Sequence, residues 1–279
     1  MPDARSCRVA LIAALCALGC QYGRADADAS GTSPRYPEVV ASHRHDSRIF
    51  TQGLAVDGST LYESSGLQGR SMLLMGAPGR PAAERSYHFP DAYFAEGLAV
   101  VGDEIMVLTW RAEKLFVFDR HSLQLKRKLG YRGEGWGLTY DGTHLLLSDG
   151  SDRINRLDPR TLESAGHIRV RDARGAVDKL NELDWDGATL YANVWQSNRL
   201  LAIDPDSGQV LAEWDLTPLA PRYTPFGRDG VANGVAFDRA SGHFWITGKG
   251  WSTLYEVRLQ APALAARAWH VREPEFHMD

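Results

Sequence analysis

The amino-acid sequence predicts an all-β protein, a five-bladed β-propeller. Five short segments repeat one pattern, in which a variable first residue precedes an apolar stretch and an Asp-Gly type of turn. Their starts are separated by 44, 40, 45 and 52 residues, the period of a radially repeated β architecture rather than of a helical solenoid. The first four repeats also contain signals for four strands each, the number in one propeller blade. The segments are Gln52–Gly58, Glu96–Gly102, Trp136–Gly142, Asn181–Gly187 and Asn233–Asp238.

An export signal is predicted at residues 1–27. Arg5 and Arg8 precede an apolar run, 9–18, that is too short for a comfortable membrane span. Two processing routes stay open: cleavage after Ala25-Asp26-Ala27, which we favour, or lipid attachment at Cys20 within an imperfect lipoprotein box. Either route predicts a protein outside the cytoplasm, periplasmic or secreted, with no membrane span.

Residues 28–35 are small and polar and predict a disordered lead-in, followed by a single propeller domain, 36–279, with a tail beyond about Ala261. All three cysteines lie in the export signal, so the predicted domain has no disulfide and no thiol nucleophile. The net charge is −4, with mixed signs and no basic cluster. This composition excludes a nucleic-acid partner.

Four antiparallel strands are predicted in each of the first four repeats. In the first, residues 53–56 form an apolar strand, Asp57-Gly58 a tight turn and residues 61–64 the returning strand. The fifth repeat lacks a fourth strand, whereas a strand predicted at 38–45 lacks a partner, so we expect this N-terminal strand to close the ring. Third strands are predicted at 71–75, 114–119, 153–158, 200–204 and 254–259, and fourth strands at 84–89, 123–129, 166–170 and 210–216.

The repeat also predicts a site. Because the first two strands of a blade form an antiparallel hairpin, the first residue of a repeat and the residue fourteen positions later lie at the same end of the blade. In the fifth repeat a two-residue insertion makes this distance sixteen. The ten positions that meet at one mouth are Gln52, Glu96, Trp136, Asn181, Asn233, Gly66, Trp110, Gly150, Trp195 and Lys249.

These side chains favour proton-transfer chemistry on a compact ligand. A carboxylate, Glu96, that is walled by indoles and faces Lys249 can serve as a proton shuttle. The three tryptophans predict a flat apolar slot, and the amides supply donors for a carbonyl oxygen. A single Trp at a strand end is more often a rim filler, but three at equivalent positions indicate a shared role. Motifs for serine hydrolases, zincins and P-loop proteins are missing.

Other polar residues favour structural roles. His43 and His45 have the spacing of metal ligands, but alternation places both on one face of the closing strand, which we expect to be solvated. Asp149, Glu182 and Asp184 could bind calcium, although Asp next to Gly is usually a turn residue. Glu63 is a possible second acid, one position short of the mouth pattern.

Eight stretches carry a resemblance to a known family. They are Phe50–Leu54, Leu61–Leu67, Tyr93–Leu98, Gly135–Leu138, Leu180–Leu183, Ala192–Trp195, Asn233–Ala236 and Thr247–Trp251. In this order they resemble the plant and bacterial type of glutaminyl-peptide cyclotransferase. The resemblance implies a five-bladed propeller enzyme, without metal or cofactor, that converts the N-terminal glutamine of peptides or proteins to pyroglutamate with loss of ammonia. The segment Phe226–Ala232 departs from the family pattern and leaves the roles of Arg228 and Asp229 open.

The resemblance also implies roles for single residues. The family's catalytic glutamate falls on Glu96, and its polar site residues on Gln52, Asn181 and Lys249. Which amide serves the oxyanion stays open. The substrate-binding positions are Trp110, Trp136, Trp195, Phe50 and Phe94, to which the repeat pattern adds Asn233.

Two other functions remain as alternatives. A calcium-dependent propeller lactonase would recruit Glu96, Asn181 and Asn233 around the cation, but the tryptophans and Lys249 would crowd and repel it. A non-catalytic periplasmic propeller that binds peptides or glycans would use the same slot without chemistry.

Overall fold

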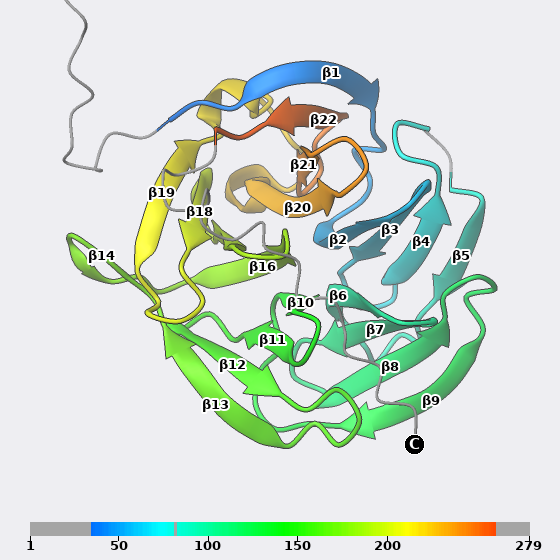
Figure 1. The fold of residues 1–279 in the computed structure, drawn as a ribbon. Helices are drawn as coiled ribbons and strands as arrows, with labels where there is room; N and C mark the ends of the chain where they lie inside the picture. The colour runs from blue at the N-terminus through cyan, green and yellow to red at the C-terminus, as the bar shows by residue number, and fades with distance from the viewer. Residues whose placement is uncertain (1–34, 81–82, 261–279) are drawn as a thin grey trace, which may run out of the picture. The chain divides into compact units, whose positions relative to one another are not determined.

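The computed structural model describes residues 35–80 and 83–260. Five four-stranded antiparallel sheets are arranged around one axis, which is the five-bladed propeller that the repeats predict (Figure 1). The chain divides into two units, Met1–Ser30 and Gly31–Asp279, and every described residue belongs to the second unit. The predicted export signal, the lead-in up to residue 34 and the tail lie outside the described residues.

Each blade runs from an inner strand at the axis to an outer strand at the rim. The first blade contains β2 (Thr51–Asp57), β3 (Thr60–Ser65), β4 (Met72–Gly76) and β5 (Arg85–His88), and the second β6 (Ala95–Val101), β7 (Glu104–Thr109), β8 (Lys114–Asp119) and β9 (Leu125–Gly130). The third contains β10 (Leu138–Tyr140), β11 (Leu145–Ser148), β12 (Arg153–Leu157) and β13 (Ser164–Arg169), and the fourth β16 (Leu180–Trp185), β17 (Leu190–Val194), β18 (Arg199–Ile203) and β19 (Val210–Asp215). The fifth contains β20 (Ala232–Asp238), β21 (His243–Gly248), β22 (Thr253–Arg258) and, on its outside, β1 (Glu38–Arg44).

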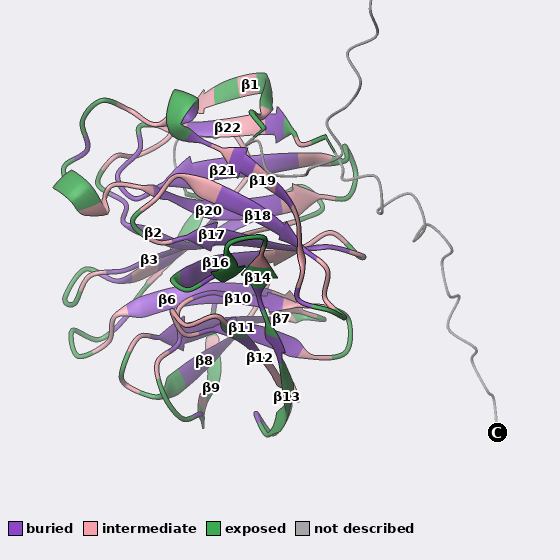
Figure 2. Cartoon of the chain, turned by 90° about the vertical axis from the view of Figure 1, so that its left-hand side faces the viewer, coloured by how far each residue is buried: buried purple, intermediate pink, exposed green. Residues whose placement is uncertain are grey.

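Burial follows the order of the strands within a blade. The middle strand β7 is buried along most of its length, whereas the outer strands β9 and β13 are mostly exposed, a contrast visible in Figure 2. Two-sided burial explains the near-continuous apolar runs of the inner strands, and one-sided exposure explains the polar outer ones. The predicted strands begin and end within two residues of the observed ones.

Each pair of neighbouring blades shares one hydrophobic cluster, so the core consists of five seams. The seam between the fifth and first blades has the fewest buried residues, namely Leu54, Ala236, Trp245 and Leu254. The two ends of the described chain meet within the fifth blade, where β1 pairs antiparallel with β22.

The seam between the fifth and first blades also contains a buried ion pair. His45 Nε2 lies 3.0 Å from Glu63 Oε1, and the two side chains are only 8% and 7% exposed. The other ring nitrogen, Nδ1, lies 2.8 Å from the Trp251 carbonyl, and Thr51 Oγ1 donates to Glu63 Oε1 at 2.7 Å. We call His45, Glu63 and Thr51 the closing clasp. The predicted solvated face of His43 and His45 is therefore wrong: β1 ends at Arg44, and the His43 ring lies against Trp245 at 5.2 Å.

The repeat glycines allow the inner strands to approach each other at the axis. A Cβ on Gly137 would lie 1.9 Å from the Asn181 carbonyl oxygen, and one on Gly97 would lie 2.4 Å from the Leu138 nitrogen. The fourth repeat has Glu182 at the equivalent position, and its Oε1 accepts a 2.8 Å hydrogen bond from the Leu54 amide in another blade. Backbone contact, rather than side-chain packing, therefore explains why glycine recurs at this position of the repeats.

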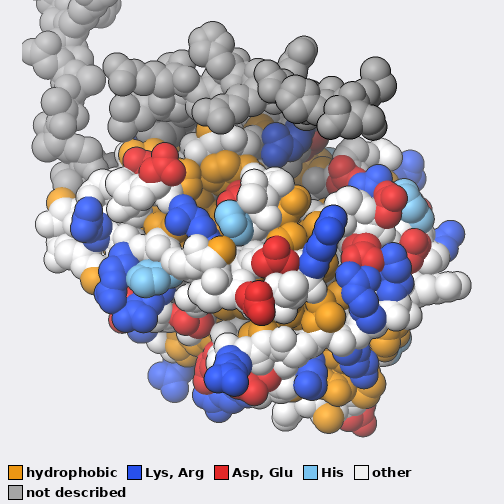
Figure 3. All heavy atoms as spheres, turned by 60° about the horizontal axis from the view of Figure 1, so that its bottom comes forward, with side chains coloured by type: hydrophobic (Ala, Val, Ile, Leu, Met, Phe, Trp, Pro, Cys, Tyr) orange, Lys and Arg blue, Asp and Glu red, His pale blue; other side chains and the backbone are white. Residues whose placement is uncertain are grey.

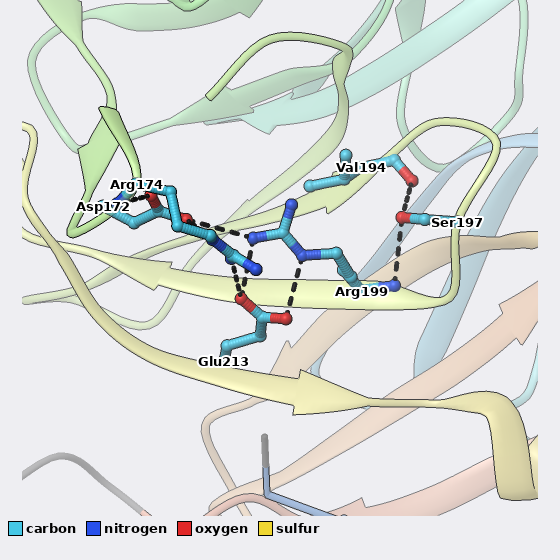
Figure 4. Close-up of polar contacts among 6 residues, drawn as sticks. All are labelled: Asp172, Arg174, Val194, Ser197, Arg199 and Glu213. Carbon is cyan, nitrogen blue, oxygen red and sulfur yellow. Dashed lines mark hydrogen bonds and ion pairs between the residues drawn. The ribbon is translucent and has the colours of Figure 1, made fainter. Parts of the chain in front are cut away.

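Three features were not predicted. A small hairpin, β14 (Arg171–Asp172) with β15 (Gly175–Ala176), follows the third blade and is held to β18 and β19 by a network of Asp172, Arg174, Arg199 and Glu213 (Figure 4). Two 3₁₀ helices, η1 (Thr217–Leu219) and η2 (Gly227–Asp229), lie between the fourth and fifth blades. Arg35, assigned to the lead-in, forms a β-bridge with Trp214 of the fourth blade.

The surface carries charges of both signs. On the face seen in Figure 3, Lys and Arg side chains alternate with Asp and Glu, as the mixed composition suggests. In the part of the chain that the structure describes, none of the helices is long and apolar enough to cross a membrane.

Candidate active site

In four of the repeats, the first residue lies at an irregularity in the pairing between two strands. The register shifts between Thr51 and Gly53, Ala95 and Leu98, Leu180 and Leu183, and Ala232 and Val235. A β-bulge leaves residues unpaired and redirects their side chains, which is why bulges occur next to active sites. The residues inside these irregularities include Gln52, Glu96, Asn181 and Asn233, which are the variable first residues of four repeats.

Hydrogen bonds between neighbouring blades also fix the backbone around these first residues of the repeats. Each of the five seams has one near the axis, and together they form a closed set that we call the inner circle. Ser64 Oγ donates to Glu96 O (2.6 Å), Gly97 N to Trp136 O (2.7 Å), Ser148 Oγ to Asn181 O (2.6 Å), Gly234 N to Asn193 Oδ1 (3.0 Å) and Asn233 Nδ2 to Thr51 O (3.0 Å).

A cavity of about 270 Å³ lies at this mouth of the propeller. That volume is just below the usual range for small-molecule sites and suits a ligand of about one residue. Ten residues are predicted to be catalytic or substrate-binding, and nine of them line this cavity: Phe50, Gln52, Phe94, Glu96, Trp110, Trp136, Asn181, Trp195 and Lys249.

The tenth predicted residue, Asn233, lies behind the cavity wall. It is fully buried, and its Nδ2 donates to the Thr51 carbonyl and contacts Gln52 Oε1 at 3.4 Å. The structure thus gives Asn233 a supporting position under Gln52. Because the carbonyl end of the Gln52 amide faces Asn233, its NH₂ group is the end available to a ligand.

Glu96 combines burial with freedom from protein partners. The residue is 5% exposed, and no described residue donates a hydrogen bond to its carboxylate. Burial raises the pKa of Glu96 well above its ordinary value, with Lys249 opposing the shift and Glu134 adding to it. A raised pKa makes the carboxylate a stronger base than an ordinary glutamate, as a group that accepts a proton and later returns it requires.

Lys249 supplies the matching cation. The residue is 3% exposed, and burial lowers its pKa to about 8, against the opposing charges of Glu96, Asp229 and Glu182. Its Nζ lies 4.9 Å from the centre of the Phe50 ring. Among the described residues it forms no ion pair, so its charge is available to a ligand.

Aromatic side chains form the wall. Trp136 and Trp195 meet edge to face, with 5.3 Å between ring centres and 86° between planes. Phe94 lies 5.6 Å from Trp110 and 6.2 Å from Phe50. These contacts hold the rings as a rigid slot, since edge-to-face pairs add specific geometry to the buried area.

Sequence reasoning missed three residues of the site. Leu67 and Asp229 line the cavity, and Glu134 accepts hydrogen bonds from two of its indoles. Asp229 lies in the stretch whose role was left open. Glu134 stands two residues before Trp136, and this spacing, which can place two side chains on one face, is the signal that could have identified it.

The other predicted acids have structural partners. Glu63 belongs to the closing clasp, outside the cavity. Asp184 accepts a hydrogen bond from the Phe237 amide, and Asp149 accepts one from the Ser151 amide. Across residues 35–80 and 83–260, no group of three His, Cys, Asp or Glu side chains could hold a metal ion.

Comparisons with known proteins agree on one family. The family model for glutamine cyclotransferase matches residues 11–259. The chain is 35% identical over 227 residues to a glutaminyl-peptide cyclotransferase of Arabidopsis thaliana, covering 80% of this chain and 71% of the relative. The crystal structure of Myxococcus xanthus glutaminyl cyclase matches with a TM-score of 0.74 and 31% identity, over 82% of this chain and 99% of that one.

Proposed function

Because the chain belongs to the glutamine cyclotransferase family, we propose that the mouth of its propeller converts the N-terminal glutamine of a peptide or protein to pyroglutamate with release of ammonia. The enzyme is an acyltransferase in which the acyl group moves from the side-chain amide nitrogen to the α-nitrogen of the same residue. The following steps assign parts of this reaction to the residues of the cavity.

Ring closure begins when the neutral α-amine attacks its own side-chain carbonyl carbon. A new N–C bond forms, the carbonyl oxygen becomes an oxyanion, and the α-nitrogen must lose a proton. Glu96 accepts this proton, because its buried carboxylate has no protein donor to compete for it. The aromatic slot holds the glutamine side chain folded back on the amine, which turns an unlikely encounter into a near-attack conformation.

Collapse of the intermediate requires the same proton again. The bond between the carbonyl carbon and the amide nitrogen breaks, and Glu96 returns the proton to this nitrogen, which leaves as ammonia. One group therefore acts first as base and then as acid, and its raised pKa suits both halves.

The developing oxyanion faces a cation and an amide donor. Lys249 supplies the charge, and Gln52 supplies an N–H group whose orientation follows from the contact between its carbonyl end and Asn233. Donors placed where charge develops lower the barrier most when water is excluded. Only the first residue has to enter the cavity, so the remainder of the peptide stays outside.

The observation that carries this mechanism is the position of Glu96 on the cavity wall, buried and without a hydrogen-bond donor among the described residues. A Glu96→Gln variant keeps the size of the side chain and removes proton transfer. We expect its kcat to fall at least about 100-fold, the scale of general acid–base catalysis, with an unchanged circular dichroism spectrum.

Ammonia release from a Gln-initiated dipeptide measures this effect, with an Asn-initiated dipeptide as the substrate control. EDTA in all reactions separates the mechanism from a calcium-dependent lactonase, whose activity the chelator would abolish. Near-normal turnover by the Gln variant would remove Glu96 from the proton path.

We further propose that the enzyme acts outside the cytoplasm, as the predicted signal at residues 1–27 suggests. Soluble release and lipid attachment at Cys20 are the two possible outcomes. The N-terminus of the mature protein distinguishes a start near residue 28 from a lipid-modified Cys20.

A further inference from the structure

One carboxylate holds both indoles on the same side of the slot. Glu134 Oε2 accepts a hydrogen bond from Trp110 Nε1 at 2.8 Å and another from Trp136 Nε1 at 3.1 Å. Its other oxygen, Oε1, accepts from Arg111 Nε at 2.8 Å. Three donors from two neighbouring blades thus converge on Glu134, which itself lies on the loop between them.

Glu134 stands where the aromatic wall is interrupted. Phe50, Phe94 and Trp110 form one run of ring contacts, and Trp136 with Trp195 forms another. Among the ring pairs of the described residues, none joins Trp110 to Trp136. The shared carboxylate is therefore what connects the two halves of the wall.

Arg111 completes the arrangement from the solvent side. Its guanidinium carbon lies 3.9 Å from the centre of the Trp110 ring, and its side chain is 65% exposed, against 36% for Glu134. The cation covers one face of the indole while its Nε holds the carboxylate. At the surface, a stacked and hydrogen-bonded guanidinium of this kind orients the side chains that it contacts and contributes little to the free energy of folding.

We propose that Glu134, oriented by Arg111, is a positioning residue that fixes the two indoles of the slot and thereby sets the affinity for the glutaminyl end of the substrate. Because both indole N–H groups donate to Glu134, the rings present their faces to the substrate. Neither N–H group then donates to the substrate's carbonyl oxygen in competition with Lys249 and Gln52. The inference rests on the proposed function for the identity of the ligand.

The chemistry of an amide provides a sharp test. In Glu134→Gln, the side chain keeps one acceptor oxygen and gains an NH₂ group that repels whichever donor it meets, the indoles or Arg111. We expect KM to rise about tenfold with kcat within about twofold of wild type, since a slot that holds substrate and transition state alike affects mainly binding.

Adding Arg111→Met removes the competing donor and keeps an apolar stem over Trp110. The amide oxygen of Glu134→Gln can then turn to both indoles, so the double variant should recover most of the lost affinity. Arg111→Met also removes a positive charge, so the Glu134→Ala background, in which the same change of charge occurs, controls for electrostatics. In Glu134→Ala no acceptor remains, and Arg111→Met should not restore binding.

Two readouts separate this inference from the mechanism above. KM for a Gln-initiated dipeptide is measured in the wild-type background. The Kd of the same dipeptide, followed by tryptophan fluorescence, is measured in the Glu96→Gln background. If Glu96→Gln remained active, the proposed proton path would be wrong, and the KM measured in the wild-type background would still test the role of Glu134.

The matched control is Glu104→Gln. Glu104 pairs with Arg127 at 2.6 and 2.7 Å on the outer side of the second blade, and its loss should leave KM and Kd unchanged. A KM and Kd of Glu134→Gln within twofold of their parents would overturn the proposal. A double variant that binds no better than Glu134→Gln alone would do the same.

Discussion

The closing clasp makes the stability of the propeller depend on pH in a defined window. Burial alone would lower the pKa of His45, but the charge and hydrogen bond of Glu63, the Trp251 carbonyl and Asp46 outweigh it and raise the pKa to about 9, from 6.5. A folded-state pKa above the unfolded one means that His45 stabilises the fold fully below pH 6.5. This stabilisation is lost as the pH rises through 9.

The size of the effect follows from the shift. The rise of the His45 pKa from 6.5 to about 9 corresponds to about 3 kcal/mol at 1.36 kcal/mol per pKa unit. By linkage, most of this stabilisation remains at pH 7 and almost none at pH 10. That is a large fraction of a typical domain's free energy of unfolding, and it acts at the seam with the smallest apolar cluster.

Glu63→Gln removes the charge and keeps the shape of the clasp. Neutral His45 can still donate from Nδ1 to the Trp251 carbonyl, and the new amide can donate to Nε2 while accepting from Thr51. The variant should therefore fold, yet lose the dependence on pH that the ion pair confers.

The measurement is urea unfolding of both proteins at pH 7, 8, 9 and 10. Between pH 7 and pH 10 the free energy of unfolding of the wild type should fall by about 2 to 3 kcal/mol more than that of Glu63→Gln. Thr51→Val serves as the control, since it removes one hydrogen bond to Glu63 and leaves the titration of His45 in place. Parallel pH profiles for wild type and Glu63→Gln would refute the assignment of His45 as a buried cation.

Two further predictions concern the mouth of the propeller. Because the pKa of Lys249 is about 8, kcat should fall as the pH rises through 8. The Lys249→Met variant should show a larger decrease in kcat than increase in KM. A kcat that is independent of pH up to pH 9.5 would contradict the role of this cation. Gly137→Ala should prevent folding or cost more than about 3 kcal/mol by urea unfolding, because its Cβ would lie 1.9 Å from a backbone oxygen of the next blade. Gly130→Ala, where the nearest atom is the flexible Lys114 Nζ at 3.8 Å, should be tolerated, and equal stability of the two variants would contradict the close approach.

The strands and most of the cavity could be predicted because both follow from local rules. Alternation, turn residues and a fixed period define the hairpins, and antiparallel pairing then brings residues fourteen positions apart to one end of a blade. Glu96 and Trp110 are such a pair. The same rule predicted Asn233 as a lining residue, but its amide bonds to the Thr51 carbonyl across the seam, a partner that no repeat pattern shows.

Contacts between distant segments account for the other differences. His45 was predicted to be solvated by alternation along β1, yet the strand ends one residue earlier and the ring turns toward Glu63 and Trp251. Glu134 lies outside the repeated segments, and its partners come from two blades. Such side chains are placed by tertiary structure, and local sequence carries little information about them.

The inner circle has a consequence for how this mouth of the propeller can change. In an open row of repeats, altered spacing in one unit displaces every later unit; in a closed circle of five links, the same alteration must be absorbed by all five at once. The backbone therefore provides five fixed positions. New chemistry is reached by substituting the side chain at such a position rather than by moving the backbone. A designer who wishes to retarget the cavity should keep Ser64, Gly97, Ser148, Asn193 and Asn233 constant and vary the first residues of the other four repeats.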